Sequence, residues 1–114
     1  MSKIQEDFAQ SAAQLIQKAV ELGYTVTLGE AWRTPQQAEW DAQQGTGISH
    51  SLHIERLAID LDFFKDGTWI TDGSQLKDVG DWWKSLGPMY RWGGDFKTRP
   101  DGNHFSLSPD GVTA

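Results

Sequence analysis

The chain contains no cysteine among its 114 residues. Disulfide bridges, thiolate zinc sites and cysteine nucleophiles are therefore excluded. The sequence also has no apolar run close to the roughly 20 residues that a membrane-spanning helix requires, so we expect no stable membrane insertion. Dense runs of lysine and arginine are missing too, and the net charge is −6. Nucleic acids usually bind basic patches and are not an expected partner.

The first ten residues, MSKIQEDFAQ, are charged and lack the apolar centre of a secretory signal. We therefore expect a protein that is made in the cytoplasm and stays there unless another route releases it. A chain of 114 residues is long enough to bury one core, and no repeat or linker divides it. These features predict a single domain, residues 1–114, that acts as a monomer.

Periodicity and capping residues predict a mixed order of helices and strands. Helices are expected over 2–23, 34–44 and 72–86, the last carrying Leu76, Val79, Trp83 and Leu86 on one side. Strands are expected over 24–28, 57–64, 69–70 and 104–107, with a strand end or tight loop over 90–96. Because strands and helices are partly segregated, the pattern favours an α+β fold, a small antiparallel sheet packed by helices.

The segment from Leu57 to Phe64 alternates in the manner of a half-buried strand. Its apolar residues share one face, whereas Asp60 and Asp62 share the other. A histidine, His53, lies just upstream, and His104 begins the last predicted strand. Two carboxylates on a strand that otherwise resembles core call for a chemical explanation.

One explanation is a metal site. His53, Asp60 and His104 together offer two imidazoles and one carboxylate, which is a known ligand set for catalytic zinc. The ordinary alternatives are a loop histidine, a strand aspartate bonded to the backbone and a surface histidine. Ligands that lie far apart in sequence have no diagnostic spacing, so these residues alone leave the choice open.

The wider pattern resembles a known family. Residues 51–60, SLHIERLAID, are similar to the S-x-H-x-x-G-x-A-x-D signature of zinc peptidases that act on bacterial cell-wall peptides, and residues 101–104, DGNH, resemble their second signature. Residues 92–96, WGGDF, and 30–34, EAWRT, look like the phage endolysin branch. The resemblance covers residues 24–107 and implies a Hedgehog/DD-peptidase-like fold. Two positions depart from it, because Arg56 stands where the signature has glycine and Ser106 where many relatives carry an acid.

By this resemblance, the zinc ligands are His53, Asp60 and His104. Asp101 is the implied general base, close to the metal without binding it, although Asp-Gly sequences are also ordinary turn formers.

Arg33 is the implied clamp for an oxyanion or a substrate carboxylate, because its guanidinium always carries charge. Ser51 is expected to orient the site or the substrate, and a turn-capping role is the alternative. Asp62 is either a support for a ligand histidine or a solvated acid. His50 is not expected to be a ligand, and Trp82, Trp83 and Trp92 are expected mainly in the core, although Trp92 is also a candidate to line a groove.

The resemblance implies a zinc peptidase that hydrolyses a bond of the peptidoglycan stem peptide. An L-alanyl-D-glutamate endopeptidase of a phage or prophage is the favoured activity, an endolysin that needs a holin to reach the wall. A D-alanyl-D-alanine carboxypeptidase is the close alternative, and a non-enzymatic zinc-binding interaction domain is another. A wall glycosidase with Asp60 and Asp62 as its acid pair is another alternative. Only a glycosidase of this kind would remain active in the presence of a chelator.

Overall fold

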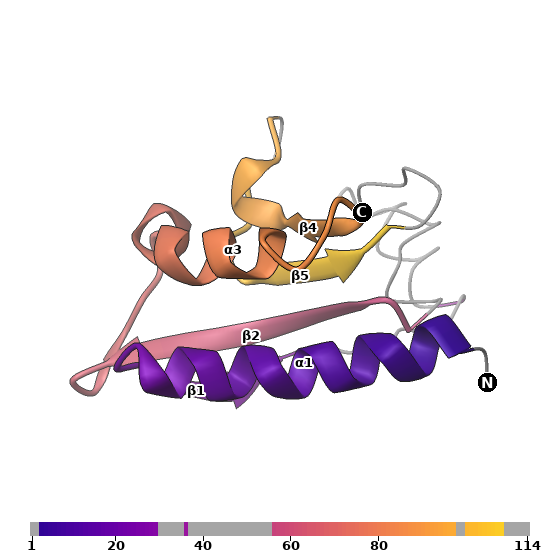
Figure 1. Cartoon of the computed structure of the whole chain (residues 1–114). Coiled ribbons are helices and arrows are strands. Elements are labelled where there is room, and N and C mark those ends of the chain that lie inside the picture. Colours follow the sequence, from indigo (N-terminus) through magenta and orange to yellow (C-terminus); the bar gives the residue numbers. More distant parts are fainter. Residues whose placement is uncertain (1–2, 30–35, 37–55, 98–99, 109–114) are drawn as a thin grey trace.

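The computed structural model describes residues 3–29, 36, 56–97 and 100–108. The elements in chain order are α1 (Lys3–Glu21), β1 (Thr25–Leu28), β2 (Ala58–Lys65), β3 (Thr68–Trp69), the 3₁₀ turn η1 (Gly73–Leu76), α3 (Lys77–Lys84), β4 (Tyr90–Trp92), η2 (Gly93–Asp95) and β5 (His104–Leu107). In Figure 1, helices α1 and α3 lie beside a sheet in which β2 is the longest of the described strands.

All strand pairs of the sheet are antiparallel. The strands follow the order β1-β2-β5-β4, and β3 pairs with the far end of β2. The central strand β2 therefore contacts three others along its length. This arrangement confirms the α+β class with a small antiparallel sheet.

Helices α1 and α3 cover one face of the sheet. Phe8 of α1 meets Trp83 of α3 edge to face, and Trp83 in turn lies edge to face against Phe105 of β5. Phe63 of β2 completes the group, with its ring centroid 5.9 Å from that of Phe105. Aromatic pairs of this kind add about 0.5–1.5 kcal/mol beyond the burial of their area. The core therefore fixes β2 and β5 side by side.

The predicted alternation of β2 is confirmed. Leu61 and Phe63 are fully buried in the core, whereas Asp60 and Asp62 on the opposite face are half-buried. A two-residue hairpin turn at Asp66 and Gly67, both with positive φ, closes β2 against β3, as such turns do between paired strands. The two acids thus lie on the face of the sheet that turns away from α1 and α3.

The helix predicted over residues 72–86 is shorter than expected. Asp72 caps the 3₁₀ turn η1 that precedes α3, because its carboxylate accepts a hydrogen bond from the Ser74 N–H at 3.0 Å. The chain first forms η1, and α3 ends at Lys84. Leu86, which was expected on this helix, therefore lies beyond its end and is 36% exposed.

Several predictions fall on other parts of the chain. The helix predicted over 34–44 lies outside the described residues except for Gln36, which is helical. Within residues 90–96, predicted as a strand end or tight loop, the chain forms β4 and η2, which together end at Asp95. No helix in the described part of the chain has the length and apolarity needed to cross a membrane.

Candidate metal centre

Asp60 and His104 lie directly opposite each other on β2 and β5. The neighbouring Leu61 N–H donates to the Asn103 carbonyl oxygen at 3.0 Å. Asp60 and His104 are therefore a non-hydrogen-bonded pair of the antiparallel ladder, in which the two residues exchange no backbone hydrogen bond with each other. Cα atoms of such pairs lie about 4.5 Å apart, the closest approach in an antiparallel ladder. The register of two strands that are far apart in sequence therefore brings both side chains to one point.

The side chains of this pair face each other. His104 Nδ1 lies 3.1 Å from Asp60 Oδ1. Ligand atoms about 2.1 Å from a tetrahedral metal ion lie roughly 3.4 Å from each other, so the two atoms are spaced as neighbouring ligands would be. The same distance suits a hydrogen bond between imidazole and carboxylate. The nitrogen and oxygen donors therefore fit a borderline-soft divalent cation.

Asp101 joins this pair from the turn before β5. One oxygen of Asp101, one oxygen of Asp60 and one ring nitrogen of His104 all lie within 4.8 Å of one another. His104 is buried, Asp60 is half-buried and Asp101 is exposed. The cluster is thus anchored in the sheet and open to solvent on the side of Asp101.

Backbone hydrogen bonds hold the Asp101 turn, residues 101–104, in place. The Asp101 N–H donates to the Gly93 carbonyl at 2.8 Å, and the His104 N–H donates to the Asp101 carbonyl at 3.1 Å. The Asp101 carboxylate also accepts the Asn103 N–H at 3.2 Å. The side chain of Asn103 donates to Asp62 at 3.0 Å. Asp62 therefore ties β2 to the turn through Asn103, a contact that neither of its two predicted roles includes.

Gly93 is the point where η2 touches this turn. A Cβ at position 93 would overlap the Asp101 carbonyl and lie 2.8 Å from the Cβ of His104. Real Cβ atoms do not approach other atoms so closely, so any side chain here would push the turn away. The first glycine of the Trp-Gly-Gly-Asp motif is thus required by the site itself.

Trp92 supports the same turn from the core side. Its indole N–H donates to the Gly102 carbonyl at 2.9 Å, and only 5% of its surface is exposed. Phe96 lies against the other side, with its ring centroid 5.5 Å from that of His104. The alternative that Trp92 lines an open groove is wrong, because its ring is buried among Gly80 and Gly94.

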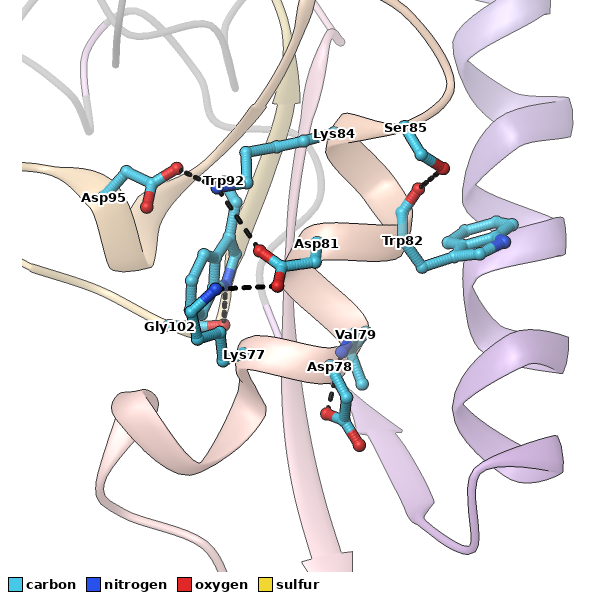
Figure 2. A network of polar contacts seen from close by, with 10 residues as sticks. All are labelled: Lys77, Asp78, Val79, Asp81, Trp82, Lys84, Ser85, Trp92, Asp95 and Gly102. Atoms are coloured by element: carbon cyan, nitrogen blue, oxygen red, sulfur yellow. Dashed lines mark hydrogen bonds and ion pairs between the residues drawn. The ribbon is translucent and has the colours of Figure 1, made fainter.

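A chain of ion pairs joins α3 to the segment around Trp92 (Figure 2). Lys84 contacts Asp81 at 3.5 Å and Asp95 of η2 at 2.7 Å, and Asp81 also meets Lys77 at 2.7 Å. The hydrogen bond to Asp95 is the main reason that the pKa of Lys84 lies above its usual value. The hydrogen bond from Lys77 is the main reason that the pKa of Asp81 lies below its usual value. These groups are largely exposed, so they position the segment more than they stabilise the fold.

Three of the predicted site residues, Arg33, Ser51 and His53, lie outside the described residues, as does His50. The structure thus brings Asp60, Asp101 and His104 together and leaves the other assignments as predictions. Arg56, which replaces a glycine of the signature, has φ 61°. This left-handed conformation is one that glycine adopts freely and arginine only with strain, so the position has a backbone conformation for which the glycine of the signature is suited.

Sequence reasoning missed the supporting role of Trp92, Gly93, Phe96 and Asn103. Within the sequence, the Trp-Gly-Gly-Asp motif indicates only the resemblance to a family. Two adjacent glycines beside a tryptophan do signal a close backbone approach, although not to which turn. The sequence gives no sign that Asn103 bonds Asp62.

The glycosidase hypothesis finds little support in this arrangement. Asp60 faces His104 and Asp62 bonds Asn103, so the two acids have different partners. A pair of carboxyl groups that works on one glycosidic bond must instead face the same substrate atoms. The geometry favours the metal-site explanation.

The comparisons with known proteins agree with this geometry. Residues 44–107, more than half of the chain, match the family model described as D-alanyl-D-alanine carboxypeptidase. No curated protein matches the chain. Among solved structures, the chain is similar to the L-Ala D-Glu endopeptidase ChiX of Serratia marcescens, with a TM-score of 0.68 and 19% identity over 95% of this chain and 89% of that one. This second likeness establishes the fold alone. The family match has more weight, and by it the chain belongs to the D-alanyl-D-alanine carboxypeptidase family of peptidases.

Proposed function

We propose that this protein is a zinc-dependent peptidase of the bacterial peptidoglycan stem, and specifically an L-alanyl-D-glutamate endopeptidase. The observation that carries the proposal is the pairing of Asp60 with His104 at 3.1 Å beside Asp101. The family match supports a peptidase, and the fold neighbour bears the name of an L-Ala D-Glu endopeptidase. A nitrogen and an oxygen donor next to an exposed carboxylate form the right set for metal-assisted hydrolysis.

In this proposal Asp60 and His104 would hold the zinc together with His53. When bound, zinc supplies Lewis acidity that polarises the scissile carbonyl and lowers the pKa of water toward about 7. Asp101 accepts the proton of the attacking water and transfers it to the leaving amine. The carboxylate of Asp101 is exposed and the turn holds it in position, so it is accessible to both the attacking water and the leaving amine.

Arg33 and Ser51 complete the proposed machinery. The guanidinium of Arg33 steadies the developing oxyanion or a substrate carboxylate, and Ser51 orients the peptide. Both assignments rest on the resemblance of residues 30–34 and 51–60 to the family signatures. Each can be tested by replacement once activity is measured.

The biological setting is proposed on the same grounds. The protein would serve as a single-domain, monomeric endolysin of phage or prophage origin, made in the cytoplasm and released to the wall by a holin. Cells that make the protein in the cytoplasm should then lyse only when a holin is produced with it. Lysis without a holin would argue against the need for one.

A D-alanyl-D-alanine carboxypeptidase is the second candidate, because the matching family carries that description. The two activities release different products from the same substrate. An endopeptidase leaves new L-alanine termini on the glycan strands, whereas a carboxypeptidase releases free D-alanine. A non-enzymatic zinc domain would bind the metal and release neither.

The decisive experiment is digestion of purified peptidoglycan, with the soluble and insoluble fragments identified by mass spectrometry. Parallel digestions contain a chelator, or a chelator followed by zinc. New L-alanine termini that disappear with chelator and return with zinc are the expected result. Cleavage that persists in the chelator would contradict the zinc mechanism, and free D-alanine would favour the second candidate.

A further inference from the structure

An exposed tryptophan stands on the same face of the sheet as the metal centre. Trp69 of β3 is 55% exposed, whereas tryptophan side chains are on average largely buried. It lies directly opposite Phe64 of β2. Side chains at every second residue of a strand share a face, so Phe64 points to the same side as Asp62 and Asp60. Trp69 therefore meets the solvent on the side of the sheet that carries the metal cluster.

The pairing of β3 with β2 brings the side chains of Phe64 and Trp69 close together. The Ile70 N–H donates to the Phe63 carbonyl oxygen at 2.9 Å. Phe64 and Trp69 are therefore a non-hydrogen-bonded pair, the kind in which side chains approach each other most closely. Phe64 is half-buried and Trp69 is exposed. The two side chains form an aromatic platform that is open to solvent.

An open strip of the sheet connects this aromatic platform with the metal centre. Along β2, Asp60, Asp62 and Phe64 are half-buried, while the residues between them are buried in the core. Thr25 and Thr27 of β1 are exposed on the same face, because they lie opposite residues of this row. The four residue steps from Asp60 to Phe64 span about 13 Å. A ligand that extends from the metal centre along the strip meets carboxylates and hydroxyls first and the aromatic platform at the end.

A surface of this composition is suited to a carbohydrate. The C–H groups on one face of a sugar ring pack against the electron-rich face of an indole. The hydroxyl groups at the rim of the sugar exchange hydrogen bonds with hydroxyl and carboxylate side chains. Tryptophan is enriched where proteins bind partners, because its large ring is apolar and its N–H is polar. The strip therefore fits a ligand in which a sugar is joined to a peptide.

The stem peptide of peptidoglycan has such a sugar at one end. Its L-alanine is joined through a lactyl group to the muramyl sugar of the glycan. The alanine and the lactyl group together span about two residue lengths, or about 7 Å when extended. When the bond after this alanine lies at the metal centre, the muramyl ring and the sugar attached to it can reach the outer half of the strip, where Trp69 lies.

We propose that Phe64 and Trp69 form a subsite for the sugars of the glycan strand, on the carbonyl side of the scissile bond. This proposal rests on the proposed function and adds to it the direction in which the substrate lies. Binding energy gained away from the reacting bond contributes to kcat/KM. The enzyme therefore cleaves a stem peptide that is attached to its sugars better than a free one. A carboxypeptidase would show no such preference, because its bond lies at the far end of the stem.

The test compares two soluble substrates that differ only in their sugars. One is a stem peptide that carries the wall disaccharide, and the other is the same peptide with the lactyl group alone. The kcat/KM of the zinc-loaded wild type is measured on both, together with that of Trp69→Ala, Trp69→Leu and Trp69→Tyr. Val20→Ala is the matched control, because Val20 is 57% exposed and lies on α1, on the opposite side of the sheet. Thermal melting and zinc content show whether each variant keeps its fold and its metal.

The wild type and Val20→Ala should prefer the disaccharide substrate by about 5- to 20-fold, the range expected when a sugar covers one face of an aromatic side chain. Trp69→Ala and Trp69→Leu should lose most of this preference through the disaccharide substrate alone. Both variants should cleave the sugar-free peptide within about threefold of wild type. Trp69→Tyr should keep most of the preference, because an aromatic face remains. If Trp69→Ala does not fold, Trp69→Leu decides, because leucine still covers the hairpin but has no aromatic face.

Three results would overturn the proposal. Equal cleavage of both substrates by the wild type would show that the sugars are not recognised. A loss by the same factor on both substrates in Trp69→Leu would indicate a structural role in the hairpin, and no loss on either would leave Trp69 without a role in binding. If the wild type binds zinc and cleaves neither substrate, the proposed function itself fails, and the subsite is rejected with it.

Discussion

Replacing Trp92 by phenylalanine removes one donor and part of one ring from the support beneath Asp101. The indole N–H bonds the Gly102 carbonyl at 2.9 Å, and both groups are buried. Losing this bond and leaving the carbonyl unsatisfied costs about 1–2 kcal/mol. The smaller ring also leaves a cavity beside Gly80. At about 24 cal/mol per Å³ of cavity volume, this cavity adds roughly 1 kcal/mol to the loss of unfolding free energy.

The sum is about 2–3 kcal/mol of unfolding free energy. A chain of 114 residues has an unfolding entropy of about 240 cal/mol/K near its melting temperature. The Trp92→Phe variant should therefore melt about 8–12 °C below wild type. Because Gly102 lies between Asp101 and His104 in sequence, we also expect kcat to fall by about tenfold or more, since small misplacements of catalytic groups are costly.

The assay is thermal unfolding followed by circular dichroism, with kcat measured well below both melting temperatures. Trp82→Phe is the matched control, because Trp82 is half-buried and its indole makes no hydrogen bond within the described residues. It should melt within about 3 °C of wild type. If Trp92→Phe melts within about 2 °C of Trp82→Phe, with both close to wild type, the role assigned to Trp92 is wrong.

Three further predictions concern the same site and its surroundings. Asp101→Asn keeps an acceptor for the Asn103 N–H, so it should melt within about 2 °C of wild type and yet lose about 10²- to 10⁴-fold in kcat; retention of activity within tenfold would exclude Asp101 as the base. Gly93→Ala should destabilise by about 1–3 kcal/mol or more in chemical denaturation, because its methyl group overlaps the Asp101 carbonyl. Burial, and then Asp78, raise the pKa of Tyr24 above 10.0. The hydrogen bond from Tyr24 to Asp78 at 3.0 Å should therefore make wild type about 1 kcal/mol more stable than Tyr24→Phe below pH 10. Because the unfolded chain ionises first, this advantage should shrink as the pH rises through the folded-state pKa; an advantage that grows above pH 10 would contradict the assignment.

The strands that carry the site could be read from the sequence because their patterns are local. Strict alternation over 57–64 placed Asp60 on the polar face of β2 and Leu61 in the core. The short run His104–Leu107 has the composition of a strand, and its predicted bounds match β5. Local signals of this kind fix which residues share a face, and they do not depend on the rest of the fold.

The meeting of Asp60 with His104 could not be read in the same way. It requires β5 to pair with β2 in one register, and a slip of one residue would turn His104 to the other face. The residue types alone offered Asp60 and His104 as one possible ligand set among ordinary alternatives, and the resemblance to family signatures favoured that set. Which strands are neighbours depends on the packing of Trp83, Phe63 and Phe105, which lie far apart along the chain.

The support of the turn was also beyond prediction. A tryptophan at position 92 suggests core, but its bond to Gly102 depends on where the turn over 101–104 lies in the fold.

The most direct test of the central claim is the zinc content of the purified protein and of variants at its metal centre. Wild type and Asp101→Asn should each bind one zinc per chain in elemental analysis, with similar affinity in titration after chelator treatment. His104→Ala and Asp60→Ala should lose zinc binding by several orders of magnitude while circular dichroism still shows the native secondary structure. A wild type without stoichiometric metal, or a His104→Ala variant that binds zinc as tightly as wild type, would contradict the account.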